Sequence, residues 1–130
     1  MARNRLSRRD FLKGGLFAGG VLSMANMMAF IQYRQADAQE NGPLKAAMSS
    51  AGLAGTWNAQ GQEAALAWAK LYGVEVTWFD GQFDAEKQRA AIDQAATQTW
   101  DFVAIQPNTI GTLVDPVTAM IGAGIPFIDM

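Results

Sequence analysis

The stretch "VEVTWFDGQFDAEKQRAAIDQAATQTWDFVAIQ", residues 74–106, reads as a strand, a helix and a second strand, and it decides the fold. "VEVTWF" (74–79) is rich in β-branched and aromatic residues, which predicts a strand. Asp84 precedes a run of good helix formers, so it predicts an N-cap followed by a helix over 85–98. "DFVAIQ" (101–106) predicts the next strand. Strands alternating with helices of this length imply βαβ crossovers and therefore a parallel sheet.

The same alternation extends along the chain on both sides of this stretch. The remaining elements are expected as a strand at 44–50, a helix at 56–73, a helix that opens around Pro116 and ends by Gly122, and a strand at 125–130. We therefore expect an α/β fold, with a parallel sheet in the order 2-1-3-4 and helices on both faces.

Two of these helices carry apolar residues at helical spacing, which predicts the face that each one buries. In the helix at 56–73 that face comprises Ala64, Ala65, Trp68, Leu71 and Tyr72. In the helix around Pro116 it comprises Leu113, Val117, Met120 and Ile121. Trp78 lies within a strand and Trp100 precedes one, so both are expected to be structural.

The composition excludes several classes of function. The 130 residues include no cysteine and no histidine, so a disulfide framework, a Cys/His zinc site and Ser-His or Cys-His catalysis are excluded within this chain. From Gln39 onward four basic residues face ten acidic ones, a net charge of −6. Because nucleic acid needs a basic surface that neutralises its phosphates, we expect no nucleic-acid partner. We also expect no catalytic residue, metal or cofactor.

The first 38 residues have the features of an export signal. "SRRDFLK" (7–13) resembles the twin-arginine signal of bacteria at every defined position, and a moderately apolar run follows it over 14–31. A membrane anchor is the alternative, because this run is about as long as the minimum that spans a bilayer. Its four glycines weaken that alternative. A basic arm that binds nucleic acid is disfavoured because the residues after the arginines are apolar.

A cleavage site follows the apolar run. Ala36 and Ala38 form an A-x-A pattern, with the cut expected between Ala38 and Gln39. We therefore expect 1–38 to be a twin-arginine signal peptide and 39–43 to be a flexible lead-in. This route implies the twin-arginine translocase as a partner, folding in the cytoplasm and a mature protein in the periplasm.

A candidate binding site follows from the sheet order. Ligands of open parallel sheets bind beyond the carboxyl ends of the strands, where the strand order reverses. The order 2-1-3-4 places that point between the first and third strands, so the loops at 49–58 and 106–112 should face one crevice. The candidate ligand-binding residues are Trp57, Asn58, Gln106, Asn108 and Asp129. An indole face, three side-chain amides and a carboxylate complement the C–H faces and hydroxyls of a sugar or polyol.

The glycine-rich loop "GLAGTWNAQG" (52–61) raises the alternative of a phosphate site. It lacks the G-x-G-x-x-G pattern of dinucleotide sites and contains no lysine or arginine, so the phosphate interpretation is weak. Its glycines are expected to let the chain turn from the strand into the helix. A purely structural role stays open for Trp57, which could pack against the helix start. Asp80 is expected to be a turn or capping residue.

Five short motifs follow one another at a characteristic spacing: Lys70–Val74, Asp80, Glu86–Gln88, Ile105–Pro107 and Gly122–Asp129. Together they resemble the N-terminal lobe of periplasmic sugar-binding proteins of the ribose-binding type, the solute receptors of ABC importers. The resemblance implies that 44–130 is a partial N-terminal lobe of a two-lobe protein, truncated before the second lobe and the hinge. It also implies that Trp57, Asn58 and Asp129 contact the sugar. Met130 stands where ribose receptors often have arginine, which argues against ribose itself.

The resemblance implies a binding protein and not an enzyme. Its ligand would be a sugar or polyol, delivered to an ABC permease in the inner membrane. Two alternatives stay open from the residues alone: a sugar-sensing input domain in the periplasm, and a fragment of a nucleotide- or phosphate-binding enzyme domain.

Overall fold

The sheet has four parallel strands in the order β2-β1-β3-β4, as expected. The computed structural model describes residues 24–109 and 111–130. The strands are β1 (Leu44–Ser50), β2 (Val74–Asp80), β3 (Phe102–Ile105) and β4 (Phe127–Asp129). The described helices are α2 (Met24–Asn41), α3 (Thr56–Leu71), α4 (Ala85–Ala96) and α5 (Val114–Gly122). The α/β class, the parallel sheet and its order are therefore confirmed.

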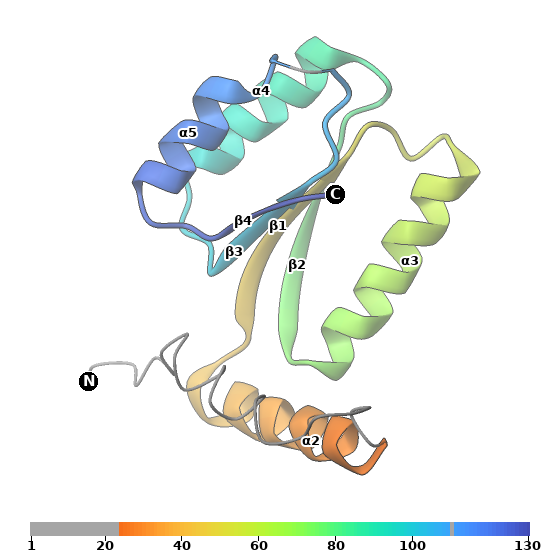
Figure 1. Cartoon of the computed structure of the whole chain (residues 1–130), viewed down its shortest axis with the longest axis vertical. Coiled ribbons are helices and arrows are strands. Elements are labelled where there is room, and N and C mark those ends of the chain that lie inside the picture. Colours follow the sequence, from red (N-terminus) through yellow and green to blue (C-terminus); the bar gives the residue numbers. More distant parts are fainter. Residues whose placement is uncertain (1–23, 110) are drawn as a thin grey trace, which may run out of the picture.

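The helices cover the sheet unequally. Helix α3 lies along one face beside β2, while α4 and α5 lie side by side over the other face (Figure 1). The main apolar core lies under α4 and α5 and comprises Ala47, Ile92, Val103, Ile105, Leu113 and Met120. Each large side chain buried there contributes about 1.5–3 kcal/mol relative to exposure. The face under α4 and α5 therefore carries most of the hydrophobic stabilisation.

Local signals predicted the ends of α4 and β4 to within a few residues. The Asp84 side chain accepts hydrogen bonds from the backbone N–H groups of Glu86 and Lys87, at 3.0 and 3.1 Å, as an N-cap should. Strand β4 is shorter than the segment 125–130 expected from the sequence. Pro126 lies at its start, and proline cannot donate a ladder hydrogen bond.

The predicted buried faces are only partly correct. In α3 the buried residue is Ala69, whereas Trp68 is 47% exposed and Leu71 is also exposed. Trp68 stacks on Tyr72 with ring centroids 5.9 Å apart, so it covers its own helix end and not the sheet. In α5 Ile121 is 54% exposed, although Met120 is buried. Helical spacing identifies an apolar stripe, but the width of the sheet beneath it decides how much of the stripe is covered.

Helix α2 lies at the end of the sheet where β1 begins (Figure 1). The Phe30 ring contacts the Tyr72 ring with centroids 5.8 Å apart, and Ala38 lies directly against Gly73. Residues 39–41, which belong to the predicted flexible lead-in, lie in the last turn of this helix. The arginine pair at 8–9 lies outside the described residues. Among the helices that the structure describes, none is long and apolar enough to cross a membrane.

Candidate functional site

The loops that follow β1 and β2 are joined by hydrogen bonds. Asp80 Oδ1 accepts from the backbone N–H groups of Leu53 and Gln82, each at 2.9 Å. The N–H of Phe83 donates to the carbonyl of Ala51 at 2.7 Å. Asp80 is therefore a turn residue, as predicted, and it also fixes the glycine-rich loop. The two loops form one unit at the carboxyl end of the sheet.

The glycines of the β1–α3 loop have a different role from the one predicted. Neither Gly52 nor Gly55 has a positive φ, so the turn does not depend on glycine geometry. A Cβ at Gly52 would lie 2.5 Å from Cδ2 of Phe83, and one at Gly55 would lie 3.0 Å from its Cζ. The expectation that these glycines serve the turn is wrong. They leave room for the ring of Phe83.

Gln88 of α4 joins the end of β1 to the loop after β3. Its side chain is 1% exposed. Its Nε2 donates to Ser49 Oγ at 3.0 Å, to the carbonyl of Ser50 at 3.3 Å and to that of Gln106 at 3.0 Å. Its Oε1 accepts from the backbone N–H of Asn108 at 2.7 Å. One buried amide thus contacts four polar groups, two at the end of β1 and two in the loop after β3.

Gln88 belongs to the family motif Glu86–Gln88, but its contacts with β1 and with the loop after β3 are not predicted from the sequence. A signal was present, because Gln88 precedes Ile92 and Ala95 by four and seven residues and so shares their buried face. A polar amide on such a face must find hydrogen-bond partners when the helix packs. The sequence could indicate that the Gln88 amide needs partners, but not that these partners lie at the end of β1 and in the loop after β3.

Arg89 holds the other end of the loop after β3. Its Nη1 donates to the carbonyl of Thr112 at 2.7 Å, and its Nη2 contacts Asp115 at 3.3 Å. Its Nε donates to both carboxylate oxygens of Asp93, at 2.9 and 3.0 Å. The hydrogen bond with Asp93 raises the pKa of Arg89 above its ordinary value, and Asp115 acts in the same direction. The guanidinium therefore stays charged, and consecutive residues of α4 anchor both ends of this loop.

The five candidate residues lie in segments that meet at the carboxyl end of the sheet. Trp57 lies in the first turn of α3 and is 81% exposed, so it does not pack the helix start. Asn58 is half-buried, and its Nδ2 donates to the carbonyl of Gly52 at 2.8 Å. Gln106 and Asn108 follow β3, where Gln88 holds their main chain. Asp129 is exposed at the end of β4, and its register partner on β3 is Ile105.

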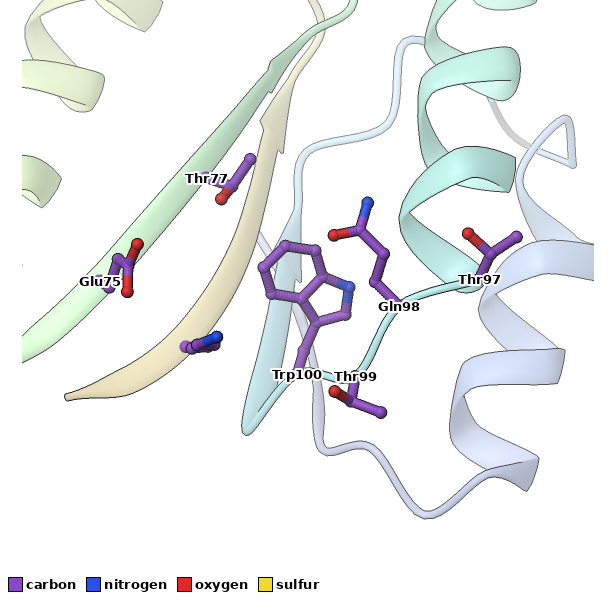
Figure 2. A pocket seen from close by; sticks show the side chains of 7 residues that line it. Glu75, Thr77, Thr97, Gln98, Thr99 and Trp100 are labelled. Carbon is purple, nitrogen blue, oxygen red and sulfur yellow. The ribbon is translucent and has the colours of Figure 1, made fainter. Parts of the chain in front are cut away.

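A hollow of about 520 Å³ lies elsewhere. It is lined by Lys45, Glu75, Thr77, Thr97, Gln98, Thr99 and Trp100. Figure 2 shows Glu75 and Thr77 on one side of it and the turn after α4 on the other, with Trp100 between them. Lys45 and Glu75 lie at the beginnings of their strands, so this hollow is at the opposite end from the candidate residues.

We assign the candidate site to the carboxyl end of the sheet and not to this hollow. Open parallel sheets bind ligands at the carboxyl ends of their strands. The indole at the hollow is also used structurally, since Trp100 Nε1 donates to the carbonyl of Ala95 at 2.8 Å and its ring meets that of Phe79 edge-on. The structural role predicted for Trp100 is therefore confirmed. Within the described residues, no cluster of acidic side chains could hold a metal ion.

The sequence of this fold matches a known family. A model of the periplasmic binding protein domain matches residues 46–130, which include the whole sheet from the third residue of β1. The chain belongs to this family. The proteins of this family are substrate-binding proteins. No curated protein matches the chain.

Solved structures of sugar-binding proteins share the fold. A galactofuranose-binding protein is 25% identical with a TM-score of 0.62, and the match covers 67% of this chain and 29% of that one. The binding component of the arabinose ABC transporter from Shewanella sp. ANA-3, bound to α- and β-L-arabinofuranose, is 25% identical with a TM-score of 0.60 over 65% and 28%. A Mycobacterium smegmatis protein in complex with β-D-fucofuranose is 26% identical with a TM-score of 0.61 over 66% and 28%. The chain thus spans less than a third of each neighbour.

Proposed function

We propose that this chain supplies one wall of a sugar or polyol site in the substrate-binding component of an ABC importer. The observation that carries the proposal is the junction at Gln88. It joins the end of β1 to the loop after β3 at the switch point of a sheet that belongs to the periplasmic binding protein family. All five candidate residues are on segments that reach this end of the sheet.

The chemistry of those residues suits a neutral, hydroxyl-rich ligand. Trp57 offers a flat apolar face of the kind that packs on sugar C–H groups. Gln106 and Asn108 carry amides that both donate and accept hydrogen bonds, and Asp129 carries an acceptor. No lysine or arginine lies in the glycine-rich loop, which is consistent with a ligand that has no phosphate.

A furanose is the favoured ligand class. Of the three structural neighbours, one is a galactofuranose-binding protein, one is bound to arabinofuranose and one is in complex with fucofuranose. A five-membered ring is smaller and less puckered than the chair of a pyranose. An exposed indole can therefore contact one of its faces while amides reach the ring hydroxyls. Because the chain spans 28–29% of these neighbours, delivery of the sugar to a permease is proposed for the whole protein.

The location of the protein is part of the proposal. Membership of the family supports the periplasm. We propose that residues 1–38 direct export by the twin-arginine translocase and that cleavage between Ala38 and Gln39 releases the mature chain. Residues 44–130 would then form the partial N-terminal lobe, and an inner-membrane ABC permease would be its partner in transport. A periplasmic sensor with the same site would bind the same sugars, so only the permease partner separates the two roles.

Titration of the ¹⁵N-labelled chain with sugars, followed by NMR, tests the proposed site. We expect L-arabinose, D-galactose or D-fucose at up to about 50 mM to shift the indole N–H of Trp57 and the side-chain amides of Asn58, Gln106 and Asn108, because half a site binds weakly. Trp57→Ala should abolish these shifts. The matched control is Trp68→Ala, which removes an exposed indole from the same helix away from the crevice. Equal shifts in both variants would refute the site.

A further inference from the structure

Two consecutive residues of the β2–α4 loop have backbones in the left-handed region. Gln82 has a φ of 52° and Phe83 a φ of 54°. Glycine and asparagine adopt this region readily, whereas a bulky aromatic residue there is an outlier that carries strain. The described part of the chain has no other non-glycine residue with a positive φ. Phe83 therefore destabilises this turn through backbone strain.

The surroundings of the loop hold this strained conformation in place. The N–H of Phe83 donates to Ala51, and the N–H of Asp84 donates to the carbonyl of Gly81 at 2.9 Å. Asp80 accepts from the N–H of Gln82 on the other side. Gly81 lies so close to the β1 loop that a Cβ there would be 2.6 Å from the carbonyl oxygen of Ala51. The turn is thus fixed from several directions, which is the condition under which strain persists at ligand sites.

The ring of Phe83 lies at the rim of the candidate site. It rests on Gly52 and Gly55, and the carbonyl of Gly52 is also the acceptor for the Asn58 side chain. Phe83 nevertheless stays 54% exposed. Burial of the ring is therefore a weak reason for its presence, since more than half of the residue remains in water. The ring can take this position only because Gly52 and Gly55 have no Cβ.

We propose that Phe83 presents an apolar ring face to the bound sugar and helps to determine which sugars the crevice accepts. The inference rests on the proposed function and adds a residue to the site. Phe83 reaches the rim from the β2 loop, and its ring and the Asn58 side chain both contact Gly52, while Trp57 is exposed in the first turn of α3. Two aromatic faces on one rim would contact the C–H groups of a sugar ring and exclude water from its hydroxyls. A polyol lacks such a ring face and would gain less from them.

The strain provides a test that separates binding from structure. Phe83→Asn removes the ring and places a residue tolerant of the left-handed region in the turn. If the ring serves the ligand, this variant should have a Tm equal to or above that of the unchanged chain, yet bind L-arabinose or D-galactose about tenfold more weakly by NMR titration. Phe83→Tyr keeps an aromatic ring and should bind these sugars as tightly as the unchanged chain does. Ile121→Ala, which truncates a side chain of equal exposure at the far end of α5, should leave the affinity unchanged.

Each outcome decides the matter. If the unchanged chain binds none of the sugars, the proposed function fails and this inference fails with it. If the unchanged chain binds and Phe83→Asn binds as tightly with the same preference among sugars, the inference alone is overturned. A lower Tm together with weaker binding in Phe83→Asn would also overturn it, because the ring would then be a structural part of the loop.

Discussion

The side-chain oxygen of Gln88 accepts a hydrogen bond from the main-chain N–H of Asn108 at 2.7 Å, although the two residues lie on different elements. The same amide donates to the end of β1. The buried side chain of Gln88 thus fixes the loop after β3 against the end of β1.

Gln88→Leu should destabilise the fold by about 3 kcal/mol, because it leaves several buried polar groups without partners while it preserves side-chain volume. Urea denaturation followed by far-UV circular dichroism measures the change. The control is Gln94→Leu, at an exposed position of the same helix, which should change stability by less than about 0.5 kcal/mol. Similar losses in both variants would mean that the junction has no special role.

Asp80→Ala should cost about 1–2 kcal/mol, since one carboxylate oxygen accepts from both Leu53 and Gln82. Asp80→Asn keeps an acceptor of the same shape and should lose less than half as much. Hydrogen exchange of the Leu53 amide gives a local measurement, and it should accelerate in the alanine variant. Protection unchanged in that variant would contradict the hydrogen bond.

Gly52→Ala should displace the Phe83 ring and destabilise the chain by about 1–3 kcal/mol, because its Cβ would lie 2.5 Å from that ring. The double variant Gly52→Ala with Phe83→Gly should recover much of the loss, which a double-mutant cycle measures. Gly61→Ala is the matched control. It lies within α3 with open space around it and should stabilise the helix by about 0.5–1 kcal/mol. An additive cycle would show that the glycine and the ring do not interact.

Export is tested at the N-terminus. Replacing Arg8 and Arg9 together by lysine should keep the chain out of the periplasm if the twin-arginine route is used, whereas replacing Arg3 and Arg5 by lysine should not. Cell fractionation and intact mass measure the result, and a mature chain should begin at Gln39. Equal export of both variants would argue for another route.

Local patterns predicted most of the fold. The strand and helix segments, the Asp84 cap and the strand order follow from short-range composition and from the geometry of parallel sheets. The exposure of Trp68 and Ile121 could not be predicted in the same way, because it depends on how far the sheet extends beneath each helix.

The site was predicted less completely than the fold. Its place at the carboxyl end of the sheet follows from the strand order, and so do the loops that carry Trp57 and Asn108. The contact between Phe83 and Gly52 joins two loops, and the contact between Gln88 and Gln106 joins α4 to the loop after β3. Such contacts depend on side-chain positions in three dimensions, which a single sequence pattern does not contain. The sequence therefore predicts a turn role for Gly52 and Gly55, whereas in the structure they leave space for the Phe83 ring.

The buried amide of Gln88 also has a thermodynamic consequence. Loops that are free before binding lose conformational entropy when a ligand orders them, and this loss weakens affinity. Here the main chain of the loop after β1 is already held through Ala51 and Leu53, and that of the loop after β3 is held by Gln88. Ordering of these loops is therefore complete on folding, and a sugar at the proposed site would bind a preorganised surface.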